Sequence, residues 1–581
     1  MTGRRFLLFV LFLLLAGSAL FLLTDRPKSV MDPARFLPEN TIAFIDIKNP
    51  PEQFRNFSGS RLGRQIDSVR WPDVLAALGS SADDIADFTL RLERIRAAAN
   101  SAEVRELFGR RLVVALLPPR AKVADAQAGP DLLDSLVLIA LPRHRAAVLN
   151  ILSAPFVREY RSMSRTHLGK EIRSFALSEE VTVSLAVSDG YIVAALSPDA
   201  VMACLDMSMN SLTGGTGGLD MNPEFISLRR LPDGGDDQFL YLNVKKQHDP
   251  RLAEVQAGTD RPPLLPAVQP GYAVPFGSLA LYRRPGFPGT RKMHYGGVLR
   301  FAPEILPAAG SRLRLPAPAV NAVVGEVPAD LSAYFWTNML DPHTISLALE
   351  GGGLRNQDGP LGRFEEWLLA RGNISLDAFL SLFSGQASIN VARLRGGGLL
   401  PIPRMCFRLE VSAPDKVAQL MDDLLAGQPV QTSAVNGTSV SSLQLAGGLI
   451  QPSFALDGRF FVFADSREQI ESVLGGSHEL LTRDPLFRKV DVGLAEPNNL
   501  TVFVRNAEFM ETVKGFAAWS GTLLSMSGRS QGSESRVVID QVVLPILEGL
   551  KMYSAVSARL FSGREEVVIE ATLLVDEQER M

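Results

Sequence analysis

The segment Leu37-Pro38-Glu39-Asn40-Thr41-Ile42-Ala43-Phe44 returns later in the chain as Val327-Pro328-Ala329-Asp330-Leu331-Ser332-Ala333-Tyr334. In both places a proline and small or polar residues precede a run that is typical of a β-strand. The second segment begins 290 residues after the first, at position 327 instead of 37. A similarity over this distance predicts that one structural unit occurs twice in the chain.

Three further pairs of short motifs follow in the same order. They are Leu107-Phe108-Gly109 with Leu382-Phe383-Ser384, the segment from Ser184 to Gly190 with that from Ser453 to Gly458, and Asn222-Pro223-Glu224-Phe225 with Asp484-Pro485-Leu486-Phe487. The separation falls along the series, which indicates shorter loops in the second copy. We therefore predict a first module at residues 33–301, a Pro/Ala-rich linker at 302–323, a second module at 324–575 and a polar tail at 576–581.

Turn signals predict how the strands of each module pair. Asn436-Gly437, a strong hairpin signal, lies between alternating segments, and Leu168-Gly169 occupies the corresponding place in the first copy. Asp189-Gly190 and Asp457-Gly458 predict a second hairpin in each copy. Because two-residue turns force antiparallel pairing, we predict an α+β fold. It has two tandem homologous modules, with mostly antiparallel sheets and helices on one face, after an N-terminal transmembrane helix.

The predicted elements alternate along the chain. Strands are expected at 112–117, 136–141, 191–196, 239–244, 405–411, 460–464 and 500–504, and helices at 143–152, 198–205, 415–425, 467–474, 507–519 and 537–550. The helix at 507–519 carries an apolar stripe that includes Phe509, Val513, Phe516 and Ala517. We favour packing of this stripe on its own sheet over contact with a membrane or a partner. Residues 258–275 are rich in proline and are expected to form a loop.

Composition excludes several classes of protein. Of 581 residues, 46% are hydrophobic and 21% are charged, which is a globular profile and not that of a disordered chain, a collagen or a coiled coil. The net charge of −4 gives no basic field for nucleic acid. The two cysteines, Cys204 and Cys406, are not at equivalent positions, so we expect buried free thiols and not a disulfide.

The N-terminus predicts attachment to a membrane. Arg4 and Arg5 precede an uncharged apolar run of 18 residues from Phe6 to Leu23. As a helix this run would be about 27 Å long, close to the ~30 Å hydrocarbon core of a bilayer. A cleaved signal peptide is the alternative, but apolar residues continue past the small residues at 17–19. We therefore predict that residues 1–32 form a single-pass anchor in a bacterial inner membrane and that the body is exported to the periplasm.

The modules resemble those of a bacterial family of exported, membrane-anchored proteins of unknown function. Such modules open with Leu-Pro-x-Asp/Asn-Thr-x-x-Phe/Tyr, which here is the segment from Leu37 to Phe44. They continue with an Asp-Gly hairpin, here from Ser184 to Val193, and with an Asp/Asn-Pro-x-Phe helix start at Asn222. The second module departs at Leu331-Ser332, which replaces the threonine step. The resemblance implies export and anchoring, and it carries no catalytic residues.

The sequence contains no clear motif for a metal site or a phosphate-binding loop. The six histidines are His144, His167, His248, His294, His343 and His478, and none is two to four residues from another, so no local metal pair forms. The glycine-rich stretches 214–218, 351–353 and 396–398 lack the lysine and hydroxyl of a phosphate loop. We interpret all three as flexible loops.

Two other patterns resemble catalytic motifs. Gly528-Arg529-Ser530-Gln531-Gly532 matches GxSxG but sits in a Ser/Gly-rich stretch, so a loop is expected in place of a strand–turn–helix elbow. The pairs Asp83-Asp84, Asp236-Asp237 and Asp422-Asp423 are expected to be helix starts or solvated loops, because adjacent carboxylates point apart.

The strongest hypothesis is a non-enzymatic, membrane-anchored envelope protein that acts as a binding or scaffold module. Its expected contacts are the membrane, through the run from Phe6 to Leu23, and an envelope protein or a lipid, with no nucleic acid and no cofactor. One alternative is a carrier or sensor of an apolar ligand in a cleft between the modules. A weaker alternative is a hydrolase whose site is assembled from distant residues, with Ser530 facing a histidine and a carboxylate.

Overall fold

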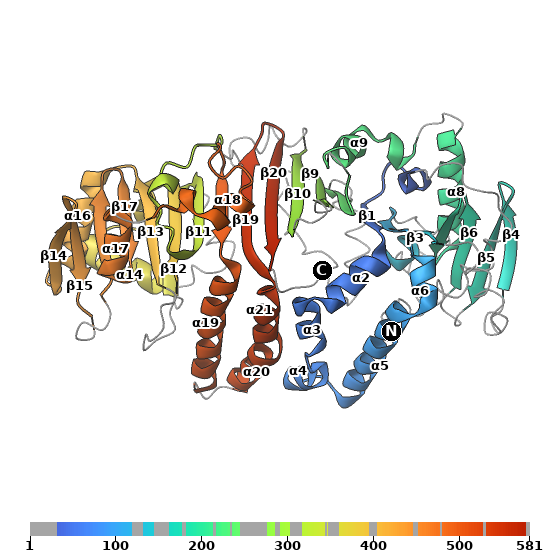
Figure 1. The fold of residues 1–581 in the computed structure, drawn as a ribbon, viewed down its shortest axis with the longest axis horizontal. Helices are drawn as coiled ribbons and strands as arrows, with labels where there is room; N and C mark the ends of the chain where they lie inside the picture. The colour runs from blue at the N-terminus through green and yellow to red at the C-terminus, as the bar shows by residue number, and fades with distance from the viewer. Residues whose placement is uncertain are drawn as a thin grey trace.

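The computed structural model describes residues 32–118, 132–143, 162–176, 182–212, 217–232, 235–244, 276–284, 291–302, 316–342, 346, 360–393, 404–445, 451–476, 479–526 and 530–576. In these ranges twenty strands join in one sheet, drawn in Figure 1, and each strand runs antiparallel to its neighbours. The predicted α+β class with antiparallel sheets is confirmed at this level.

The first and the last ten strands have the same order in space. The first ten are β1(Ala43–Lys48), β2(Arg111–Leu116), β3(Leu136–Leu141), β4(Ser162–His167), β5(Lys170–Ala176), β6(Thr182–Ser188), β7(Tyr191–Ala195), β8(Gln238–Asn243), β9(Phe276–Arg284) and β10(Lys292–Phe301). They lie in the order β4-β5-β6-β7-β3-β2-β1-β8-β9-β10.

The last ten strands are β11(Leu331–Leu340), β12(Phe383–Ala392), β13(Met405–Val411), β14(Val430–Val435), β15(Thr438–Leu443), β16(Ser453–Asp457), β17(Phe460–Ala464), β18(Leu500–Val504), β19(Tyr553–Ser562) and β20(Glu566–Val575). Their order is β14-β15-β16-β17-β13-β12-β11-β18-β19-β20. This is the order of the first ten strands, with each label raised by ten. We call the two sets and their helices the first and the second half.

The halves join at a seam where the tenth strand of each runs antiparallel to the other. Lys292 of β10 pairs with Leu574 of β20, and the register continues to Arg300 opposite Glu566. The Arg300 side chain donates a hydrogen bond to Glu566 at 3.1 Å across this seam. The sheet therefore continues through the junction without an interruption in backbone pairing.

The repeated sequence motifs make the same local contacts in both halves. The Leu219 amide donates to the Leu37 carbonyl at 2.8 Å, and the Leu481 amide donates to the Val327 carbonyl at the same distance. One helix follows each contact, α9(Pro223–Arg229) or α18(Pro485–Val490). The side chains of Asn222 and Asp484 cap these two helices by accepting from the amides at Phe225 and Phe487. The repeated motifs therefore mark the start of a strand and the start of a helix in each half.

The hairpin turns also form where the sequence predicted them. Leu168 and Asn436 have φ of 50° and 48°, and the glycines that follow have φ of 72° and 84°. Two successive residues with positive φ make the turn that fits the right-handed twist of a hairpin. Only a residue without a Cβ adopts the second of these conformations without strain, which explains the glycine in each pair.

Helices cover both faces of the second half, so the prediction of helices on one face was wrong. Along β17, Val462 packs with α17(Arg467–Leu474) on one face, and Phe461 packs with α14(Pro360–Gly372), α15(Leu376–Leu380) and α16(Pro414–Leu425) on the other. Successive side chains of a strand point to opposite faces. The continuous apolar run of β17 is therefore that of a strand buried on both sides.

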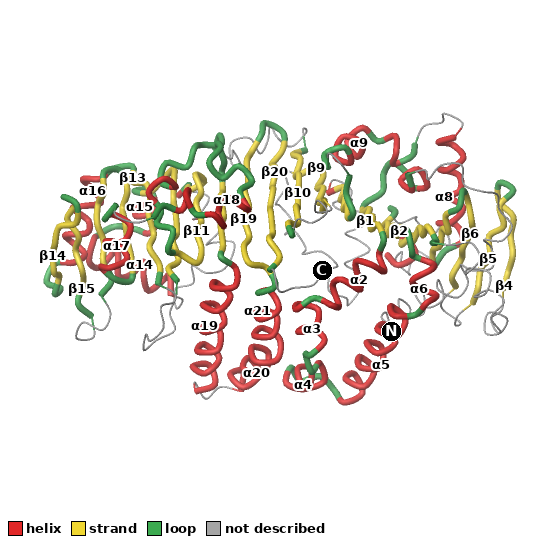
Figure 2. Tube along the Cα trace, viewed as in Figure 1, coloured by secondary structure: helices red, strands yellow, loops and turns green. Residues whose placement is uncertain are grey.

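The remaining helices belong to two groups. Near the sheet lie η2(Pro33–Phe36), α6(Ala102–Leu107), η3(Leu132–Ser135), α8(Pro198–Leu212), η5(Leu219–Met221), η6(Val324–Glu326) and η8(Leu481–Arg483). The others extend away from the sheet and are called the helical projection here: α2(Pro50–Gly59), α3(Arg61–Asp67), α4(Trp71–Ala77), α5(Ala82–Asn100), α19(Asn506–Met526), α20(Ser530–Val538), the π-helix η9(Ile539–Val543) and α21(Leu544–Leu550). Figure 2 shows them in red below the yellow strands.

The helical projection has one arm from each half. The first-half arm follows β1, and the second-half arm lies between β18 and β19. They meet where α3 packs on α21, and there the Arg61 side chain pairs with Glu548, which also accepts from Lys514 at 2.8 Å. A Cβ on Gly549 would lie 2.7 Å from the Leu62 Cα, so glycine is what permits this close approach.

Several other sequence predictions can be compared with the structure. Residues 316–323, at the C-terminal end of the expected linker, pack on the second half. There Ala319 forms a bridge with Asn498, and Val323 is buried. Most of the expected helix at 143–152 and the loop at 258–275 lie outside the described residues. The expected anchor from Phe6 to Leu23 also lies outside them, and no described helix is long and apolar enough to span a bilayer.

The contact at Gly549 leads to a stability prediction. We expect Gly549→Val to lower the free energy of unfolding by about 1–3 kcal/mol, because the larger side chain forces α3 and α21 apart. Urea unfolding of the full chain measures the change. Gly59→Ala is the control, since a Cβ there meets nothing within 4 Å, and it should change stability by no more than about 1 kcal/mol. Equal stability of the two variants would contradict the assigned packing.

Candidate functional site

The described histidines take part in pairwise contacts. The His167 Nε2 lies 2.7 Å from Asp206 Oδ1, which ties the β4–β5 turn to α8. His294 Nδ1 lies 2.9 Å from the Thr572 hydroxyl across the seam, and burial with nearby Lys292 lowers the pKa of this histidine. The other four histidines lie outside the described residues. Within those residues, no group of three or more His, Cys, Asp or Glu side chains could hold a metal ion.

Ser530 begins a helix, so the expected loop was wrong there. Residues 527–529 lie outside the described part, but α19 ends at Met526 and α20 begins at Ser530. A nucleophile elbow needs a strand before the serine, and here a helix precedes it. Helix α20 lies in the projection, whereas α8 with Asp206 lies over the outer strands of the first half (Figure 1). The structure therefore does not bring Ser530 to the His167–Asp206 pair.

The acidic pairs lie in three different settings. Asp83 and Asp84 stand in the first turn of α5, as predicted. Asp422 and Asp423 are exposed in the second half of α16, so they are not at a helix start. Asp236-Asp237 was expected at a helix start or in a solvated loop, and this was wrong. Asp236 pairs with Lys48 and Arg229, and Asp237 pairs with Arg283.

The structure describes both cysteines and part of one glycine-rich stretch. Cys204 on α8 and Cys406 on β13 are both buried free thiols, as predicted. Burial raises the pKa of Cys406 to about 12, so this thiol stays protonated and unreactive near neutral pH. Of the three glycine stretches, only Gly217 and Gly218 lie among the described residues.

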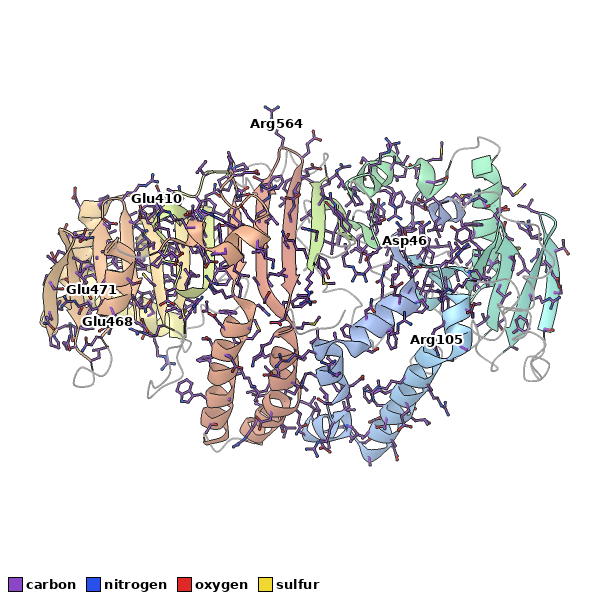
Figure 3. All side chains as sticks on the ribbon, in the orientation of Figure 1. Asp46, Arg105, Glu410, Glu468, Glu471 and Arg564 are labelled. Atoms are coloured by element: carbon purple, nitrogen blue, oxygen red, sulfur yellow. The ribbon has the colours of Figure 1, made fainter. Side chains whose placement is uncertain are left out.

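Asp46 forms the most buried charged network in the first half. Its side chain is 1% exposed and accepts two hydrogen bonds from Arg111, at 2.8 and 2.7 Å, and another from Arg229. Arg229 also pairs with Asp236 at 2.5 Å, and Asp236 pairs with Lys48 at 2.7 Å. Figure 3 labels Asp46 among the strands of the first half.

The network has the properties of a structural ion cluster. Burial alone raises the pKa of Asp46, but the hydrogen bonds and charges of Arg111 and Arg229 outweigh it and lower the pKa below its usual value. In the second half, Trp336 of β11 stands 290 residues after Asp46 and is buried in an apolar cluster. The two halves therefore fill corresponding positions with different chemistry, which the sequence repeat did not reveal.

An aromatic ladder in the second half connects the core to the surface. Phe461 and Phe383 are buried with ring centroids 6.0 Å apart, Phe379 follows at 5.3 Å, and Phe364 of α14 follows at 5.8 Å. The Phe364 ring stacks on Trp367 at 5.8 Å with 20° between the planes. Trp367 is 42% exposed. The ladder therefore holds a large aromatic side chain at the surface in a fixed position.

This ladder is the best candidate for a recognition site among the described residues. Exposed aromatic side chains that are held by a packed core are typical of the few residues that dominate a protein interface. Leu369, which is also exposed, extends the apolar surface of α14. Helix 360–372 was not among the sequence predictions.

The ion network leads to a second prediction. Asp46→Asn should lower the free energy of unfolding by about 3 kcal/mol at pH 7, because Arg111 and Arg229 lose the buried carboxylate that they share and keep only Asp32 and Asp236 as partners. The pKa of Asp46 is lower in the folded state than its unfolded value of about 3.9, so its contribution is present above that pH and is lost as the pH falls further.

Urea unfolding at pH 7 and at pH 3 measures both effects. The difference between the wild type and the Asn variant should be smaller at pH 3. Asp422→Asn, an exposed carboxylate on α16, is the control and should have little effect at either pH. An equally stable Asp46→Asn variant at pH 7 would show that the network contributes nothing.

No protein-family model matches the chain, and no curated protein matches it. A solved structure described as "Structure of crystal form I of TP0453" is similar to 48% of this chain and to 81% of that chain, with 12% sequence identity and a TM-score of 0.23.

Proposed function

We propose that the chain is a non-enzymatic envelope protein, anchored in a bacterial inner membrane through the run from Phe6 to Leu23, with its body in the periplasm. In this proposal the body is a binding or scaffold unit made by duplication of one α+β module, at residues 33–301 and 324–575. The equal strand order of the two halves and their equal caps at Asn222 and Asp484 support the duplication.

The aromatic ladder is the observation that carries the binding role. Trp367 and Phe364 are held from below by Phe379 and the buried core, so their orientation is set before a partner arrives. Such pre-organisation removes part of the entropy cost of binding. We therefore assign α14 as the surface that contacts a protein partner in the envelope.

The continuous sheet supports a scaffold. Backbone pairing across β10 and β20 and the contact of α3 with α21 tie the halves together at two places. A surface on α14 and a surface on the helical projection are thereby held at a fixed distance. A flexible linker between independent modules would not fix that distance.

The two alternatives find less support. A carrier needs a cleft between the modules, but the described residues there pair strand to strand, from Lys292 with Leu574 to Arg300 with Glu566. A hydrolase needs a serine near a histidine and a carboxylate, but Ser530 begins a helix in the projection, away from the pair of His167 and Asp206.

The third prediction tests the surface on α14. Full-length tagged protein is crosslinked in membranes, and bound envelope proteins are identified by mass spectrometry. Trp367→Ala should lower the recovery of the specific partner, with an affinity loss of roughly 30-fold or about 2 kcal/mol.

Met221→Ala is the matched control, since Met221 is 54% exposed on the first half and should leave recovery unchanged. Thermal melts check that both variants remain folded. If Trp367→Ala retains every partner of the wild type, or if the wild type recovers no specific partner, the proposed binding role is wrong.

A further inference from the structure

The sheet ends in one open strand of each half. Strand β4 pairs only with β5, and β14 pairs only with β15, among the strands that the structure describes. Figure 1 shows β4 and β14 at opposite ends of the sheet. An open edge presents backbone amides and carbonyls that can pair with another chain. Because β4 and β14 hold equivalent positions in the two halves, their edges can be compared directly.

The register of the β14–β15 hairpin shows which backbone groups of β14 point outward. The Gln444 amide donates to the Pro429 carbonyl at 3.0 Å, one step before Val430, the first residue of β14. Hydrogen-bonded pairs alternate along an antiparallel ladder, so the odd-numbered residues of β14 bond to β15. The amides and carbonyls of Thr432 and Ala434 therefore face away from the sheet.

The β14 edge is accessible from both faces of the sheet. Gln431 and Thr432 are neighbours along the strand, so their side chains point to opposite faces, and both residues are exposed. The Asn436 side chain, in the hairpin turn, donates to the Leu474 carbonyl at the end of α17 at 2.8 Å. The hairpin is therefore held against the fold while its outer strand stays open.

The two open edges differ in the features that prevent strands from associating. Residues 430–443 contain no charged residue and no proline, and β14 pairs with β15 without a register shift. The corresponding residues 162–175 of the first half include Arg165, Lys170, Glu171 and Arg173. Charges, prolines and bulges are the usual means by which an edge strand avoids pairing with another molecule. Since β14 has none of them, the comparison favours association at β14 over association at β4.

A second copy of the chain fits the β14 edge. Around a two-fold axis through Thr432 and perpendicular to the sheet, each Thr432 lies opposite the other, Val430 lies opposite Ala434, and Gln431 lies opposite Ser433. A two-fold axis places like charges near each other, and this strand has no charge to repel its copy. The molecule already joins two equivalent edges in this way, because β10 and β20 are the tenth strands of their halves and pair antiparallel.

We infer that β14 pairs antiparallel with β14 of a second copy of the chain, so that the sheets of two molecules become one. The strand is six residues long, so this contact is smaller than the roughly 1,200–2,000 Å² buried in stable complexes. The dimer therefore dissociates at concentrations of about 1 μM or above. It does not depend on the partner proposed for α14.

The test measures self-association of the full chain in detergent micelles by sedimentation at about 1 to 100 μM. We expect the wild type to form a dimer as the concentration rises. Thr432→Lys and, separately, Thr432→Glu place two like charges across the axis and should raise the dissociation constant at least about tenfold. An equal mixture of the two variants should associate again, because opposite charges then meet at the axis.

Met163→Lys is the matched control, because Met163 is 78% exposed on the equivalent edge strand β4. This variant should associate like the wild type, and thermal melts check that every variant is folded. A wild type that stays monomeric, or a dimer that both Thr432 variants leave unchanged, overturns the inference. Loss of the dimer in Met163→Lys also overturns it, since the contact then lies at β4. If the two Thr432 variants are monomeric and their mixture is too, Thr432 does not face its own copy and the inference is wrong.

Discussion

The antiparallel pairing of β10 with β20 is the constraint on which the rest of the architecture depends. Each strand is the last of its half, so each half without the other would leave an open edge of unpaired amides and carbonyls. Pairing satisfies these groups and makes one sheet of twenty strands. Because the pairing fixes register and direction, it also determines which strand ends of the two halves lie on the same side of the sheet.

The arrangement of the strand ends determines where the helical projection lies. The two arms are inserted at different connections, after β1 in the first half and after β18 in the second. In a single half these two connections lie at opposite ends of the strands, since β1 and β8 run antiparallel. The antiparallel seam reverses the second half relative to the first, so the two helical arms leave the sheet on the same side and meet there. There Gly549 allows α21 to approach α3 closely.

The halves share a fold but differ in how their interiors are stabilised. The first half buries Asp46 with Arg111 and Arg229, and the second half buries Trp336 at the corresponding place in β11. A buried charge tolerates no loss of its partners, whereas an apolar core tolerates small changes in shape. At this pair of corresponding positions the two halves therefore differ in their response to acid and to substitution, although the same turns and caps form both.

The sequence by itself determined the elements that depend on neighbouring residues: the hairpin turns at Leu168 and Asn436, the caps at Asn222 and Asp484, and the strands between them. These features follow from backbone conformation and local hydrogen bonds, so a short stretch contains the information. The sequence also contains the apolar run from Phe6 to Leu23 that predicts an anchor. Only the tertiary structure decided that the halves share one sheet, that helices cover both faces of the second half, that the aromatic ladder reaches Trp367 and that both helical arms leave one edge. Each of these depends on contacts between residues far apart in the chain, which no local pattern encodes.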